Sequence, residues 1–122
     1  MGCSMTWEVV TVRHFDEWFH EQTSAMQEDI LAMMLILSEY GPSLGRPYVD
    51  TVKMSDYSNM KELRIQHQGN PVRAFFAFDP TRKAVVLCAG VKTGVNQKQF
   101  YQQMIRNADA EFRQYLHNLE NK

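Results

Sequence analysis

The sequence has little that could cross-link it covalently or through a metal. Its 122 residues include only two cysteines, Cys3 and Cys88. Neither lies in a cluster with the spacing of metal ligands, so we expect neither a structural zinc site nor a disulfide framework. Cys88 lies in an apolar run, where we expect a buried thiol and not a nucleophile. Chains without disulfides are typical of a reducing compartment, so we expect a cytoplasmic protein.

Long apolar runs and catalytic signatures are also missing. No apolar run approaches the roughly 20 residues that span a bilayer, so we expect no membrane association. The sequence carries no signature of a serine hydrolase, a zinc protease or a P-loop nucleotide-binding protein. The four histidines match no ligand spacing, and we expect them to be surface or structural residues: His14, His20, His67 and His117. We therefore expect no metal and no cofactor.

The composition is that of a folded chain. Hydrophobic residues make up 44% and charged residues 22% of the sequence, an ordinary globular balance that argues against disorder. We expect one domain over residues 1–122, with residues 1–5 as an N-terminal extension.

Charges of opposite sign separate along the chain. Residues 1–50 hold two basic and eight acidic residues, whereas residues 51–122 hold eleven basic and six acidic ones. Within residues 61–106 eight basic residues stand against only Glu62 and Asp79. This asymmetry indicates a face for a polyanion; the alternative is a solvated surface on which charges happen to segregate.

Hydrophobic periodicity and turn residues predict an α+β order of elements, β-α-α-β-β-β-α. We expect a strand at 7–12, a helix at 14–22, a second helix from a Ser24–Gln27 capping box to Gly41, and a loop at 42–60. Strands should follow at 61–67, 72–78 and 84–89, and a last helix from Asn96 to about Leu119. Apolar stripes predict the buried faces of the two longer helices: Met26, Ile30, Met33, Met34 and Leu37 in the first, and Phe100, Met104, Ala108, Phe112 and Tyr115/Leu116 in the second. The short connections at 69–71 and 79–82 predict that the three later strands form an antiparallel meander.

Alternation along the first strand of the meander predicts where its side chains point. Leu63 and Ile65 should face the helices, and Glu62, Arg64 and Gln66 the opposite side. We expect this second face to be open and to carry basic side chains. The ends of the meander should then bring several cations and one phenol together: Lys61, Arg64, Arg73, Lys92, Lys98 and Tyr101. Such a group could bind phosphate, although strand edges also carry charges simply to discourage aggregation.

Several short segments resemble the RelE/ParE toxin superfamily, above all its HigB-like, phage-derived branch. They are Glu62-Leu63-Arg64, Val72-Arg73-Ala74-Phe75-Phe76, Lys92 after the third strand of the meander, Phe100-Tyr101 in the last helix, and Leu44 to Lys53. The resemblance implies a RelE-like fold, with an N-terminal strand and helical hairpin packed on a small antiparallel sheet.

The resemblance also implies an activity, the metal-independent cleavage of mRNA, commonly on the ribosome. The ribose 2′-OH attacks the adjacent phosphate, which requires a base, cations for the developing charge and an acid for the leaving oxygen. Arg64 and Arg73 would stabilise the phosphate, and Lys92 would stabilise charge or act as the acid.

The remaining roles stay open at this point. Either Lys61 or Glu62 would be the base, and Tyr101 would stack on a base of the RNA or orient the 2′-OH. Four further residues would contact the substrate: Arg82, Lys83, Lys98 and Phe100.

The implied partners are mRNA and a HigA-like antitoxin with a helix-turn-helix domain. Two other functions remain open on the same fold. One is a ParE-like gyrase poison, and the other is a catalytically inactive module that binds RNA or protein.

Overall fold

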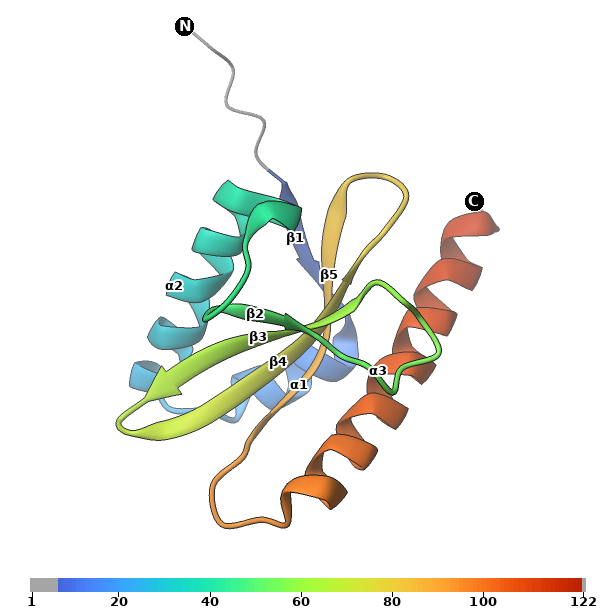
Figure 1. Cartoon of the computed structure of the whole chain (residues 1–122). Helices are drawn as coiled ribbons and strands as arrows, with labels where there is room; N and C mark the ends of the chain where they lie inside the picture. Colours follow the sequence, from blue (N-terminus) through green and yellow to red (C-terminus); the bar gives the residue numbers. More distant parts are fainter. Residues whose placement is uncertain (1–6, 122) are drawn as a thin grey trace, which may run out of the picture.

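The computed structural model describes residues 7–121, which form a five-stranded sheet and three α-helices (Figure 1). The strands are β1 (Glu8–Thr11), β2 (Val49–Thr51), β3 (Met60–His67), β4 (Asn70–Phe78) and β5 (Lys83–Val91). The helices are α1 (Arg13–His20), α2 (Ser24–Tyr40) and α3 (Gln97–Glu120), with a 3-10 turn, η1, at Gly41–Ser43. The α+β class and the C-terminal helix are confirmed. The expected N-terminal extension over residues 1–5, with Cys3, lies outside the described residues.

The strand order in the sheet is β1-β5-β4-β3-β2. Strands β3, β4 and β5 form the expected antiparallel meander. Strand β1 adds to the sheet in parallel beside β5, with Val10 opposite Val85, so the sheet is mixed and not purely antiparallel. A parallel pair needs a long crossover, and the helices α1 and α2 with the β2–β4 segment provide it.

The prediction that residues 42–60 form only a loop is wrong. Residues 49–51 form strand β2, which pairs antiparallel with β3 and places Asp50 opposite Glu62. Three residues are too few to show an alternating pattern in the sequence. The strand forms because Val49 is buried in the core and the backbone pairs with the edge of β3.

The prediction of one open sheet face is also wrong, because helices cover both faces. Helices α1 and α2 lie on one side of the sheet and α3 lies on the other (Figure 1). The cause lies in β4 and β5, which are apolar on both sides; strands of this kind have to be buried on both faces. Phe76 and Val86 belong to the core beneath α1 and α2, whereas Phe75 and Leu87 belong to the core beneath α3.

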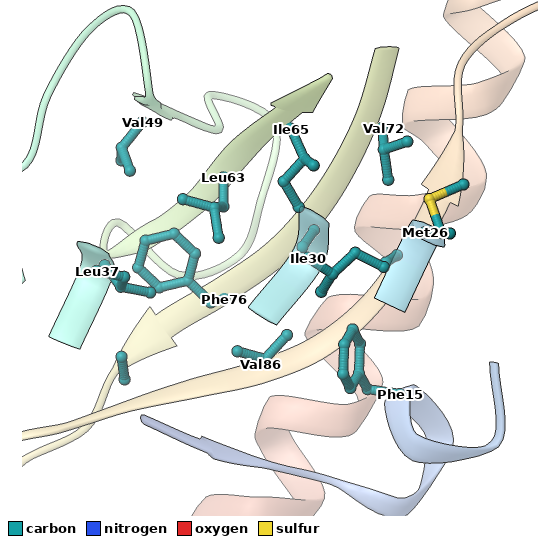
Figure 2. Close-up of a cluster of buried hydrophobic side chains, with 13 residues drawn as sticks. Phe15, Met26, Ile30, Leu37, Val49, Leu63, Ile65, Val72, Phe76 and Val86 are labelled. Atoms are coloured by element: carbon teal, nitrogen blue, oxygen red, sulfur yellow. The ribbon is translucent and has the colours of Figure 1, made fainter. Parts of the chain in front are cut away.

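The core beneath α1 and α2 is shown in Figure 2. The α2 positions predicted to form an apolar stripe supply it, with Met26, Ile30 and Leu37 buried against the sheet. As predicted, Leu63 and Ile65 of β3 point into this core. Removing such buried side chains costs several kcal/mol, so this layer holds β3 firmly in register.

Helix α2 begins at Ser24, so its cap lies one residue earlier than predicted. Thr23, and not Ser24, is the N-cap: its Oγ1 accepts a hydrogen bond from the backbone N–H of Met26 at 3.2 Å. Gln27 lies four residues after this cap and forms no capping box with it; its Nε2 donates to the carbonyl of Phe19. The helix ends as predicted at Gly41, whose φ of 56° favours glycine.

Helix α3 begins after the predicted cap, Asn96, whose Oδ1 accepts a hydrogen bond from Gln99 N at 3.1 Å. Ala108 and Phe112 of its predicted stripe are buried against β4 and β5. Cys88 is buried there too, as predicted, and burial raises the pKa of its thiol to about 12. Within residues 7–121 no helix has both the length and the apolarity needed to cross a membrane.

Asp79 organises the turn between β4 and β5. Its Oδ1 accepts from the backbone N–H groups of Thr81 and Lys83, both at 2.9 Å, and its Oδ2 accepts from the Tyr115 hydroxyl at 2.6 Å. Burial raises the pKa of Asp79, but these hydrogen bonds outweigh it and hold the pKa below its ordinary value of 3.8. The buried carboxylate thus ties the turn to α3.

We predict that Asp79→Ala lowers the free energy of unfolding by about 2–3 kcal/mol at neutral pH, because several buried donors lose their acceptor. Urea denaturation followed by circular dichroism measures this. A group with a depressed folded-state pKa stabilises above its unfolded pKa, so the difference between wild type and variant should shrink as the pH falls below about 4. Asp56→Ala is the control, because Asp56 pairs with Arg113 only at the surface and should change stability by less than about 1 kcal/mol. Equal losses in the two variants would contradict this role.

Candidate functional site

Two arginines face each other across the ladder between β3 and β4. Arg64 and Arg73 are register partners, and Arg73 is in turn opposite Gly90 of β5. Like charges directly opposite each other destabilise an antiparallel pair. The arrangement therefore works against the stability of the sheet unless other groups neutralise it.

A chain of hydrogen bonds neutralises one of the two arginines. Tyr101, in the first turns of α3, donates its hydroxyl to Glu62 Oε1 at 2.7 Å, and Arg64 Nε donates to Glu62 Oε2 at 3.1 Å. Glu62 is only 4% exposed, so its carboxylate is held between these two donors. The prediction placed Glu62 on an open surface. Because α3 covers this face of the sheet, Glu62 is buried instead.

Asp50 extends the same network and was missed in the sequence. Its Oδ2 accepts from Arg64 at 3.2 Å and from Arg46 at 3.1 Å. The hydrogen bond from Arg46 is the main cause that holds the pKa of Asp50 below its ordinary value. The hydrogen bond from the backbone N–H of Thr51 and the positive charges of Arg46 and Arg64 act in the same direction. Its only signal in the sequence was its place in the segment Leu44 to Lys53, which resembles the RelE/ParE superfamily. Strand β2, which places Asp50 opposite Glu62, is too short to show a periodic pattern.

Arg73 has no carboxylate partner among residues 7–121. Its Nη1 donates to the backbone carbonyl of Val72 at 3.1 Å, its guanidinium also interacts with the Tyr101 hydroxyl, and its buried Nε has no partner there. No carboxylate within residues 7–121 neutralises this guanidinium, so its charge is kept for a ligand. A planar donor fork of this kind fits the oxygens of a phosphate.

Lys92 and Tyr101 complete the cluster. Lys92 Nζ lies 3.5 Å from the Tyr101 hydroxyl and 5.3 Å from the centre of its ring. Burial, and then the charge of Arg73, lower the pKa of Lys92, against an opposing effect of Glu62. Burial and the hydrogen bond to Glu62 raise the pKa of Tyr101 to about 12, against an opposing effect of Arg73. The phenol therefore stays protonated at neutral pH, and the ammonium gives up its proton more readily than an ordinary lysine.

The structure thus brings together five of the predicted residues, which we call the arginine cluster: Glu62, Arg64, Arg73, Lys92 and Tyr101. The prediction that Lys61 joins them is wrong. Alternation places Lys61 on the face opposite to Glu62, where its Nζ donates to Thr51 at 3.0 Å.

The predicted substrate-binding residues lie at different distances from this cluster. Arg82 and Lys83 lie at the far end of the meander, where Arg82 covers the ring of Trp7 at 4.7 Å, so they are not brought to it. Phe100 packs in the core against the space left by Gly90. Lys98 lines a separate hollow on α3 that Tyr101 also borders.

Among residues 7–121, no histidine forms a hydrogen bond or a salt bridge with a residue of the arginine cluster. His67 is buried and paired with Asp29 at 2.6 Å, which agrees with a structural role. Over residues 7–121, no three histidine, cysteine or acidic side chains are grouped so that they could hold a metal ion.

Residues 17–113, most of the chain and all of the arginine cluster, match the family described as Phage derived protein Gp49-like (DUF891). The chain belongs to this Gp49-like family. Two relatives in Mycobacterium tuberculosis (strain ATCC 25618 / H37Rv) support the assignment. "Putative toxin HigB2" is 40% identical over 119 residues, and "Putative toxin HigB3" is 37% identical over 108. These alignments cover 97% and 88% of the chain; the chain spans 59% of the HigB2 relative's length and 92% of the HigB3 relative's.

The fold is that of a RelE-like protein. The chain is similar to a chain in the crystal structure of the archaeal RelE–RelB complex from Pyrococcus horikoshii OT3, with a TM-score of 0.54 and 18% identity. The match covers 75% of the Gp49-like chain and all of the archaeal one. This match confirms the expected RelE-like fold, and the phage-derived family and the two HigB relatives confirm the expected resemblance to the HigB-like branch.

We predict opposite effects on stability when the two arginines are replaced by methionine, which keeps most of the apolar stem. Arg64→Met leaves the buried Glu62 with one donor fewer and should lower the free energy of unfolding by about 1–3 kcal/mol. Arg73→Met removes a like-charge contact and should leave stability unchanged or raise it by up to about 1 kcal/mol. Urea denaturation of both variants provides the comparison. A large loss in Arg73→Met would show that Arg73 is there for structure and not for a ligand.

Proposed function

We propose that this protein is the toxin of a type II toxin–antitoxin system and that it cleaves mRNA on the ribosome. The observation that carries the proposal is Arg73, a half-buried cation with no carboxylate partner among residues 7–121, opposite Arg64 and near Lys92 and Tyr101. An arginine without a carboxylate partner is expected where the phosphate of a substrate supplies the negative charge. The relatives named as toxins support the cellular role.

In the proposed reaction the two arginines bind the scissile phosphate. Arg64 is fixed in direction by Glu62 and Asp50, while Arg73, whose charge no carboxylate within residues 7–121 neutralises, binds the phosphate oxygens. The ribose 2′-O attacks phosphorus, and the bond from phosphorus to the 5′-oxygen breaks. The products are a 2′,3′-cyclic phosphate and a 5′-OH, and the guanidinium groups stabilise the extra charge of the intermediate state.

The geometry of the remaining side chains supports one assignment of the base and the acid. Because Lys61 points away, Glu62 is the base of this proposal, and it acts through Tyr101. The Tyr101 oxygen accepts the 2′-OH proton as its own proton passes to Glu62 along the 2.7 Å hydrogen bond. Lys92 donates a proton to the leaving 5′-oxygen and regains one from solvent. No step of this scheme requires a metal ion.

The proposed partner is a HigA-like antitoxin with a helix-turn-helix domain. The archaeal RelE–RelB complex shows that a protein of this fold is held by a second protein. An acidic antitoxin segment that pairs with Arg73 and Lys92 would neutralise the toxin by occupying the site of the phosphate.

The direct test is Arg73→Ala. Expressed under tight control in a bacterial host, the wild-type chain should arrest growth and leave new 5′-OH ends within the reading frames of cellular mRNAs. Arg73→Ala should lower cleavage by at least about 100-fold, since a lost transition-state contact has that effect. Arg113→Ala is the charge-matched control, because Arg113 is exposed on α3 and, within residues 7–121, forms a salt bridge only with Asp56; it should cleave like wild type.

Other outcomes would contradict the proposal in favour of a specific alternative. Growth arrest with DNA damage and no new RNA ends would indicate a gyrase poison. RNA binding without cleavage by any of the three proteins would indicate an inactive binding module.

The role of Lys92 predicts a pH dependence of cleavage. An acid acts only while protonated, and the lowered pKa of Lys92 should make the rate fall with rising pH before the ordinary lysine value of 10.5 is reached. Lys92→Arg keeps the charge but holds its proton, so it should cleave at least about 100-fold more slowly and lose this alkaline fall. Single-turnover rates from pH 6 to 10, corrected for uncatalysed RNA hydrolysis, measure both. An unchanged profile in Lys92→Arg would exclude Lys92 as the acid.

A further inference from the structure

A cavity of about 540 Å³ adjoins the arginine cluster on the side of α2, and phosphate binding alone does not account for it. Arg64 and Arg73 both line it, so it begins where the phosphate would lie. Much of the remaining wall is apolar or aromatic, with Met33 of α2 and the Pro47–Tyr48 segment before β2. We call this space the Tyr48 cavity.

An exposed aromatic ring borders this cavity. Tyr48 is 47% exposed, so part of its ring is open to a ligand. Unpaired bases of RNA stack on such rings, and every base offers a flat face for the contact. A volume of several hundred cubic ångström is also the usual size of a small-ligand site and leaves room for a base beside its phosphate.

The edge of β3 adds polar groups at the same place. Strand β2 pairs only with residues 61–63, and beyond it the backbone N–H of Arg64 donates to the Tyr48 carbonyl at 2.7 Å. Alternate residues of an antiparallel strand direct their N–H and C=O to the same edge, so the backbone groups of Gln66 point the same way as those of Arg64. Gln66 is exposed and lines the cavity, where these groups can meet the edge of a base.

Asp29 supplies an acceptor on the opposite element. It also lines the cavity, and His67 binds its Oδ2 at 2.6 Å, which fixes the carboxylate in place. The second carboxylate oxygen is suited to an amino group of a base. The lining of the cavity thus offers an aromatic ring for a base, polar groups for the edge of the base and two arginines for a phosphate. Together these groups are complementary to a nucleotide.

We propose that the Tyr48 cavity binds an unpaired RNA base next to the scissile phosphate, with Tyr48 as the stacking surface. The proposal rests on the proposed function for the position of that phosphate. A peptide is the less suitable occupant, because an apolar segment would leave Arg73, which lines the cavity, without a negative partner.

Binding of an uncleavable RNA tests this inference separately from cleavage. Fluorescence anisotropy with a labelled single-stranded 2′-O-methyl oligonucleotide gives the dissociation constants of four proteins. Tyr48→Ala should weaken binding at least about 5-fold, the lower end of what one stacked base contributes. Tyr48→Phe keeps the ring and should bind like wild type. Tyr40→Ala is the matched control, because Tyr40 is 57% exposed and lines, together with Tyr48, a neighbouring hollow, but does not line the Tyr48 cavity.

The outcomes separate the two proposals. If Tyr48→Ala and Tyr40→Ala bind RNA equally, or if wild type does not bind the oligonucleotide, the base-binding inference is wrong, whatever the cleavage assay shows. If Tyr48→Ala weakens RNA binding but wild type leaves no new mRNA ends, the inference stands and the proposed cleavage fails. If Tyr48→Ala loses only binding to a co-expressed protein, the cavity is a protein site and the inference is overturned.

Discussion

Burial of β4 and β5 on both faces is the constraint on which the rest of the structure depends. Both strands carry apolar side chains to either side, with Phe75 beneath α3 and Phe76 beneath α1 and α2. The helices therefore have to cover the sheet from both sides, and charged groups have room only at the ends and edges of the strands. The arginine cluster lies at such an end, where β3 and β4 pass from under the first turns of α3.

At that end the protein sets two cations against each other and neutralises only one. Arg64 is matched by Glu62 and Asp50, while Arg73 is not matched within residues 7–121. A sheet selected only for stability would replace the second arginine, because like charges across a ladder are unfavourable. Active sites commonly retain such local costs, since the same charges stabilise a transition state when a substrate arrives.

Much of the fold follows from periodicity, but the details of the site do not. The meander, the stripe of α2 and the start of α3 could be predicted, because their apolar positions repeat over many residues. Strand β2 could not, since three residues show no period, and with it Asp50 was missed. The prediction of an open face was wrong because β4 and β5 are apolar on both sides, so both faces of the sheet have to be covered. Alternation correctly separated Leu63 from Arg64, and the same rule, applied one residue further, would have removed Lys61 from the cluster.

The central chemical proposal is that the 2′-OH of the RNA is the nucleophile. The resemblance to a toxin family and the geometry of the arginine cluster both support it. The most direct test uses purified protein, ribosomes and a short mRNA in which the cut has been mapped. The nucleotide on the 5′ side of the cut is then replaced by its 2′-deoxy form. The account predicts that cleavage at this position is lost, while the unmodified mRNA gives a 2′,3′-cyclic phosphate and a 5′-OH. Undiminished cleavage of the 2′-deoxy mRNA at the same position would contradict it.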